Sequence, residues 1–158
     1  MSRAGRTSRS RNGSLRGWVV GSLTLVQLWA APGFATEEAA YRVVVNPANP
    51  VSSLPKSEVS DLFLRKRTRW EHGLAVVPVD QSEVAPVRHA FSKEVHGKSL
   101  GGVRVYWQQR IFSGRDLPPT VMSSDQEVLA YVRTNPGAVG YVSAAASVEN
   151  VRVLKISE

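Results

Sequence analysis

The chain has 158 residues, enough for one ordinary domain, and it contains no cysteine, which excludes disulfides, thiol catalysis and thiolate metal sites. Its net charge of +7 would suit a nucleic-acid partner, but five arginines and no acidic residue fall within residues 1–35. The remaining residues carry 15 basic and 13 acidic side chains, so the basicity belongs to the N-terminal extension and no nucleic-acid partner is predicted.

The N-terminal extension has the pattern of a secretory signal. Its arginine-rich start ends at Gly17, and the apolar stretch that follows as far as Ala31 is about 14 residues long. That is short of the roughly 20 residues needed to span a bilayer. Small residues, Gly33 and Ala35, stand where a signal peptidase reads. We predict a signal peptide over residues 1–35, cleaved after Ala35, and a periplasmic or secreted product; an uncleaved membrane anchor is the alternative.

Residues 36–158 alternate between strand and helix patterns, which predicts a single α/β domain. Short β-branched or apolar runs indicate strands, and apolar residues at helical spacing indicate helices. In chain order we expect a strand over 41–47, a helix around 54–63 capped by Ser53 or Ser57, a loop to 73, a strand over 74–79, helices over 86–97 and 103–114, a loop, a helix over 123–135 capped by Ser123 or Ser124, and strands over 138–143 and 151–157.

Several stretches of this domain occur in a recognisable order. They are VVVNPANPVSSLPKSEVSDLFL, the Trp70 and Gly73 pair, VVPVD, PVRHAF, YWQQRIFSG followed by two prolines, and NPGAVGYV. From about Tyr41 to Lys155 the chain resembles the phosphate-type periplasmic substrate-binding proteins, which are the soluble receptors of ATP-driven phosphate importers. The resemblance implies one lobe of a type II periplasmic-binding-protein-like fold, with a mixed, mostly parallel sheet and helices on both faces. Full-length receptors have two lobes and hold a tetrahedral oxyanion between them.

In those relatives the lobe carries a Ser-Gly-Thr turn at a helix N-terminus, where free backbone N–H groups and the helix dipole favour an anion. The matching residues here are Ala85, Pro86 and Val87, so both hydroxyls are absent and Pro86 has no N–H to donate. The N–H groups of Val87 and Arg88 remain, together with the Arg88 guanidinium, which suits phosphate.

Two residues of the preceding turn, Gln81 and Ser82, add further donors. The candidate ligand-binding residues are therefore Arg88, Val87, Ser82 and Gln81. Acidic neighbours leave an alternative open, in which Arg88 pairs with Glu83 or Asp80 at an ordinary helix start.

Other polar clusters indicate no chemistry of their own. The basic run of Arg65, Lys66, Arg67 and Arg69 predicts a solvated loop, with an acidic partner surface or anionic lipid as the alternative. Relatives often have glycine at the position of Arg65, so the turn there should change shape or carry strain. The three histidines lack the spacing of metal ligands, and no serine has a recognisable base and acid. We predict no metal, no cofactor and no enzymatic activity.

Together these patterns predict an exported, non-enzymatic domain that binds phosphate or a similar oxyanion weakly, for transport or sensing. The alternative is a ligand-free interaction module, which would dock on an envelope partner such as a sensor, porin or transporter, or form a homodimer. Whether an ATP-driven importer is involved stays open.

Overall fold

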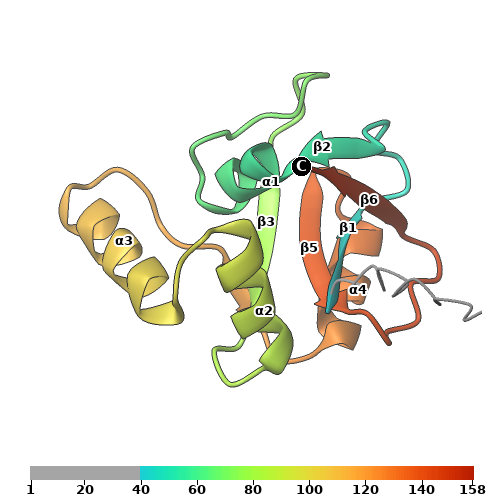
Figure 1. The fold of residues 1–158 in the computed structure, drawn as a ribbon. Coiled ribbons are helices and arrows are strands. Elements are labelled where there is room, and N and C mark those ends of the chain that lie inside the picture. The colour runs from blue at the N-terminus through green and yellow to red at the C-terminus, as the bar shows by residue number, and fades with distance from the viewer. Residues whose placement is uncertain (1–39) are drawn as a thin grey trace, which may run out of the picture. The chain divides into compact units, whose positions relative to one another are not determined.

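A computed structural model describes residues 40–158, so the predicted signal peptide over residues 1–35 lies outside the described part of the chain (Figure 1). No helix in residues 40–158 is long and apolar enough to cross a membrane. The elements of this part are β1 (Tyr41–Val45), β2 (Ser53–Pro55), α1 (Lys56–Phe63), β3 (Val77–Gln81), α2 (Pro86–Val95), α3 (Leu100–Phe112), β4 (Thr120–Met122), α4 (Asp125–Thr134), β5 (Ala138–Ser143) and β6 (Arg152–Ser157).

The strands form one sheet in the order β2-β6-β1-β5-β3-β4. Strand β1 runs antiparallel to both of its neighbours, and every other pairing in the sheet is parallel. Because Tyr41 at the start of β1 pairs with Ser143 at the end of β5, the chain enters the sheet at the edge where β3 and β5 end. This mixed, mostly parallel sheet confirms the predicted α/β class.

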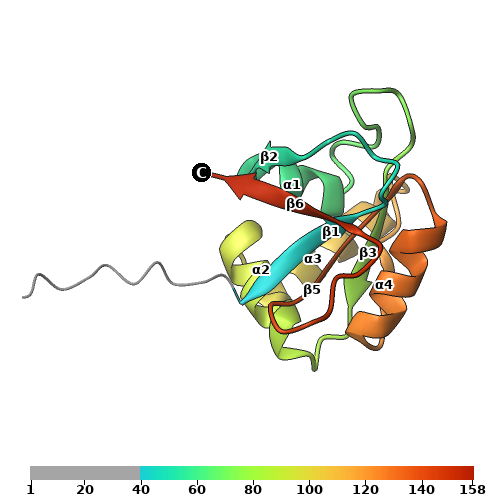
Figure 2. The same ribbon diagram turned by 90° about the vertical axis from the view of Figure 1, so that its right-hand side faces the viewer.

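Helices cover both faces of the sheet, as predicted. Helices α1 and α2 lie on one face and α4 lies on the other (Figures 1 and 2). On the first face, Phe91 of α2 stacks on Tyr141 of β5 with ring centroids 3.9 Å apart, and Phe63 of α1 packs against both rings. Helix α3 stands beyond α2 and has a small core of its own, formed by Val103, Trp107 and Leu64.

The GAVGY motif has a structural reason at both of its glycines. A Cβ on Gly137 would lie 2.1 Å from the backbone oxygen of Ala75, and one on Gly140 would lie 2.6 Å from Val128 of α4. The Gly137 carbonyl also accepts a hydrogen bond of 3.0 Å from the indole N–H of Trp70. Close packing around β5 therefore explains why this motif and the Trp70 loop occur together.

Two short strands and one strand boundary differ from the sequence prediction. Strand β3 spans residues 77–81 rather than 74–79, because the preceding residues pair back onto the loop: Trp70 N–H donates to Leu74, and Val76 N–H donates to Thr68. Strands β2 and β4 were expected to be loop or helix start. Each has three residues at an edge of the sheet, too few to show an alternating pattern.

The helix caps give a mixed result. Neither Ser53 nor Ser57 caps α1, so that prediction was wrong: Pro55 occupies the N-cap, because the chain passes directly from β2 into the helix. Helix α3 begins at Leu100, before the predicted residue 103, because Ser99 caps it by accepting from the Gly102 N–H. Ser124 caps α4, in agreement with the prediction.

The basic run after α1 is largely paired within the domain. Lys66 lies 3.2 Å from Asp61, and Arg67 contacts Glu58 and Glu71. Arg65 has a φ of 53°, in the left-handed region that favours glycine. The strain expected from the sequence is therefore present at this turn.

We predict that Arg65→Gly is more stable than Arg65→Ala by about 1 kcal/mol, because only alanine retains a Cβ in the left-handed conformation. Both variants lose the 3.7 Å contact between Arg65 and Asp116, so their difference isolates the backbone term. Urea denaturation measures it. Asn150→Gly is the control. Asn150 also has a positive φ, of 58°, but asparagine tolerates this conformation, so the variant should be stabilised over the wild type by less than about 1 kcal/mol. Equal stability of the two Arg65 variants would contradict the strain.

Candidate functional site: a pocket at the start of helix α2

The main candidate site is a pocket of about 440 Å³ at the carboxyl end of β3. In open α/β sheets, ligands bind at the carboxyl ends of the strands. The pocket lies between the turn from β3 to α2, helix α3 and the segment that leads into β4. Three of the four predicted ligand-binding residues, Gln81, Ser82 and Arg88, line it.

A buried ion pair forms the floor of this pocket. Arg88 Nη1 of α2 lies 2.5 Å from each carboxylate oxygen of Asp80, at the end of β3, and each side chain is only 7% exposed. The Tyr141 hydroxyl and the Gln81 backbone N–H donate to the same carboxylate. Burial raises the pKa of Asp80, and the Arg88 charge and the Tyr141 hydrogen bond oppose that shift. The pairing of Arg88 with an acid, left open from the sequence, therefore occurs with Asp80.

Part of the anion-binding capacity remains available at the start of α2. Arg88 Nε is buried and has no hydrogen-bond partner among residues 40–158. The N-cap residue Ala85 makes no side-chain hydrogen bond to the helix. The Arg88 backbone N–H donates to the Ala85 carbonyl at 3.0 Å, so of the two backbone donors expected from the sequence only the Val87 N–H is left. Ser82 is half-buried at the pocket wall. Arg88 and Ser82 thus line one cavity, whereas residues 85–87 at the start of α2 do not line it.

The other two predicted residues are less available to a ligand. Both amide hydrogens of Gln81 have acceptors, since Nε2 donates to Asp125 at 2.7 Å and to the Tyr141 carbonyl at 2.9 Å. A donor role for Gln81 would require one of these bonds to break. The Val87 side chain is buried in the core, so only its backbone N–H, in the first turn of α2, can contribute.

Sequence reasoning missed the side of the pocket that α3 supplies. Arg104 forms an ion pair with Glu83 at the rim, and both side chains are largely exposed. Trp107, one helical turn further on, forms a wall together with Val103. Their spacing on a helix could be read from the sequence. The sequence does not indicate, however, that this helix faces the β3–α2 turn, because that contact depends on the loop that follows α2.

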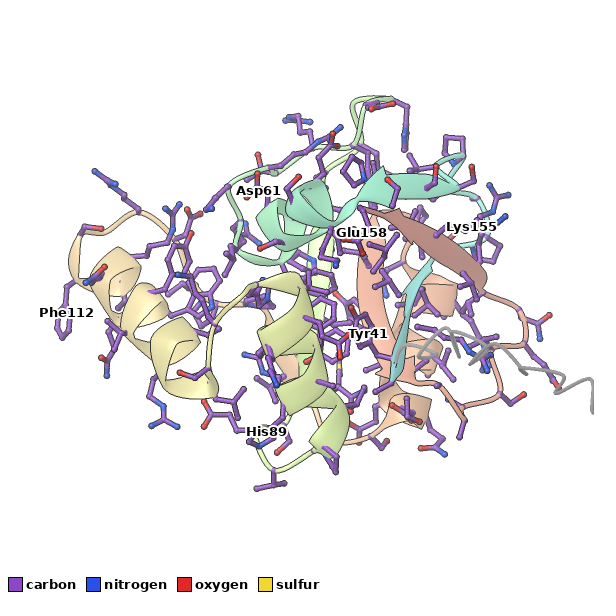
Figure 3. All side chains as sticks on the ribbon, in the orientation of Figure 1. Tyr41, Asp61, His89, Phe112, Lys155 and Glu158 are labelled. Atoms are coloured by element: carbon purple, nitrogen blue, oxygen red, sulfur yellow. The ribbon has the colours of Figure 1, made fainter. Side chains whose placement is uncertain are left out.

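The histidines have separate, local surroundings. His96 Nδ1 lies 2.9 Å from Ser60 Oγ, and its ring packs against Phe63 and Phe91. Burial lowers the pKa of His96 to about 3. His89 lies exposed on α2 (Figure 3). No group of three or more metal-ligating side chains occurs within residues 40–158.

Comparisons with solved structures agree with this architecture. The chain matches a protein assigned as a phosphate ABC transporter substrate-binding protein, with bound phosphate, from Clostridium perfringens, at a TM-score of 0.60 and 19% identity over 74% of this chain and 44% of that one. An ABC-type phosphate transport receptor from Vibrio cholerae matches at 0.59 and 19%, over 74% and 46%. PstS from Borrelia burgdorferi matches at 0.54 and 9%, over 75% and 47%.

These matches confirm the fold predicted from the resemblance. The chain has the fold of one lobe of the phosphate-type substrate-binding proteins. It spans less than half of the length of the structures it matches. No protein-family model matches the chain, and a search of curated proteins finds no significant relative.

We predict that Arg88→Met lowers the free energy of unfolding by about 3–5 kcal/mol, because it leaves the buried Asp80 carboxylate without its charge partner. The double variant Asp80→Asn with Arg88→Met should recover a large part of that loss, since no uncompensated charge remains. Urea denaturation of the two single variants and the double variant gives the coupling energy. Strictly additive effects would show that the two charges do not interact.

Proposed function

We propose that the chain is an exported, non-enzymatic substrate-binding-protein-like domain that binds phosphate or a similar oxyanion weakly at the start of α2. The observation that carries the proposal is Arg88, a buried residue in the first turn of α2 that lines the pocket and keeps an unpartnered Nε among residues 40–158. The guanidinium group of arginine is well suited to bind phosphate-like anions. The fold shared with phosphate-binding proteins adds support.

The same contacts account for the expected weakness of binding. Asp80 already neutralises the Arg88 charge, and Glu83 places a second carboxylate at the pocket. Pro86 removes one backbone donor. Two of the residues that line the pocket, Glu83 and Arg104, are exposed to solvent, so water competes for hydrogen bonds made there.

A second candidate is an interaction module that docks on an envelope partner or on another copy of itself. It is favoured by apolar side chains around α3 and β4: Phe112 is 90% exposed, Leu117 70% and Val121 60%. Phe112 projects from the outer end of α3, away from the sheet (Figure 3). Exposed apolar surface of this kind is common at protein contacts. A dimer, or a partner that stays bound at high salt and covers this surface, would favour this function.

We predict that isothermal titration detects phosphate binding in the millimolar range. The protein is expressed from the full chain and purified after any N-terminal processing by the host. Ser82→Ala should weaken binding severalfold. The double variant Ala85→Ser, Pro86→Gly should strengthen it severalfold, because it supplies one hydroxyl and one backbone N–H at the start of α2.

His89→Ala is the matched control, since this exposed side chain lies on α2 outside the pocket. Its affinity should equal that of the wild type. Sulfate and arsenate, titrated in parallel, report how far the site distinguishes tetrahedral oxyanions. An absence of heat with all three anions at millimolar concentration, in the wild type and the double variant alike, would exclude the oxyanion site.

A further inference from the structure

The pocket at the start of α2 has two chemically different halves. The polar half comes from β3 and α2, with Asp80, Ser82 and Arg88. The other half comes from α3 and from the segment before and within β4, and it presents Trp107, Pro118 and Val121. More of the lining surface is apolar than polar. An inorganic oxyanion would contact only the polar half.

The volume of the pocket also exceeds the requirement of a bare oxyanion. Sites for small organic ligands typically enclose about 300–1,000 Å³, mostly apolar with a few convergent polar groups. The pocket encloses about 440 Å³ and has this composition.

The charges in the pocket also argue against a bare oxyanion as the best ligand. The pocket contains two carboxylates and two guanidinium groups, paired as Asp80 with Arg88 and Glu83 with Arg104. Such a balanced pocket gives an anion little net Coulombic attraction. Binding energy must therefore come largely from apolar contact, which Pro118 and Val121 can supply because both are exposed at the pocket.

We propose that this pocket takes a small organic anion. Its tetrahedral phosphoryl head is held by Arg88 and Ser82, and its apolar body lies against Trp107 and Val121. The inference rests on the proposed oxyanion site and names its ligand class. The phosphoryl head is assigned to the polar half because Arg88 is only 6% exposed, lines the cavity and keeps an Nε without a hydrogen-bond partner among residues 40–158.

The test compares three probes on the purified full-chain product: phenyl phosphate, inorganic phosphate and benzyl alcohol. Phenyl phosphate should bind about tenfold more tightly than inorganic phosphate, the effect expected when roughly 50 Å² of apolar surface leaves water. Benzyl alcohol, which has the ring without the anion, should bind more weakly than phenyl phosphate.

Two variants locate the apolar body. Val121→Ser and Trp107→Leu should each reduce the preference for phenyl phosphate over phosphate, while leaving inorganic phosphate binding unchanged. Val153→Ser is the matched control for the first, because Val153 is also an exposed strand valine but lies on β6, outside the pocket. Circular dichroism verifies that each variant is folded, and Val121, which is 60% exposed, keeps the test available if Trp107→Leu unfolds.

The outcomes separate this inference from the function on which it rests. Equal affinity for phenyl phosphate and inorganic phosphate would overturn the organic ligand and leave the oxyanion site standing. Binding of benzyl alcohol as tight as that of phenyl phosphate would overturn the phosphoryl head. No binding of phenyl phosphate or phosphate would overturn both proposals. An unchanged preference in Val121→Ser and in folded Trp107→Leu would place the apolar body elsewhere and contradict the inference.

Discussion

The buried ion pair between Asp80 and Arg88 is the interaction on which the rest of the site depends. It joins the end of β3 to the first turn of α2, and the Tyr141 hydroxyl ties the same carboxylate to β5. Tyr141 in turn stacks on Phe91 of α2. Polar and aromatic contacts thus hold the start of α2 against the carboxyl edge of the sheet. Removing either charge would leave the other buried without compensation, which is far less favourable than losing both.

This arrangement also limits what the site can bind. The carboxylate that positions Arg88 cancels most of its charge, and the residues that replace the hydroxyl-bearing turn of the resembled family supply no side-chain donors. Burial of Gln81 in a network with Asp125 and Ser143 strengthens the sheet edge and removes a donor from the pocket. The charges of the site are therefore held in ion pairs that nearly balance, which fits the proposed weak binding better than scavenging of a scarce anion.

Much of the fold could be predicted from the sequence. The helices α2 and α4 have strong start and stop signals, such as Pro86, Ser124 and the NPG stop, and the order of motifs indicated one lobe of a known architecture. Edge strands β2 and β4 could not be predicted, because three residues with no alternating pattern become a strand only through their partners. The start of β3 depends likewise on tertiary contacts, since Leu74 and Val76 form backbone hydrogen bonds with the loop that contains Trp70.

The candidate site was predictable in its location and less so in its contents. The helix start after a strand marked the place, and the acidic neighbours of Arg88 indicated that an ion pair could form. Which acid pairs with Arg88 depends on β3 extending two residues past Val79, the end of the apolar run, so that Asp80 lies inside the sheet and Glu83 outside it. The residues that α3 contributes to the pocket depend on how this helix packs against the β3–α2 turn, and no local sequence pattern predicts that packing.

The most direct test of the central claim is a crystal structure of the protein grown or soaked in concentrated phosphate. The account predicts tetrahedral density at the first turn of α2, within hydrogen-bonding distance of Ser82 and Arg88, with the ion pair between Asp80 and Arg88 still formed. A pocket that holds only water under these conditions, in molecules whose α2 N-terminus is free of lattice contacts, would contradict it.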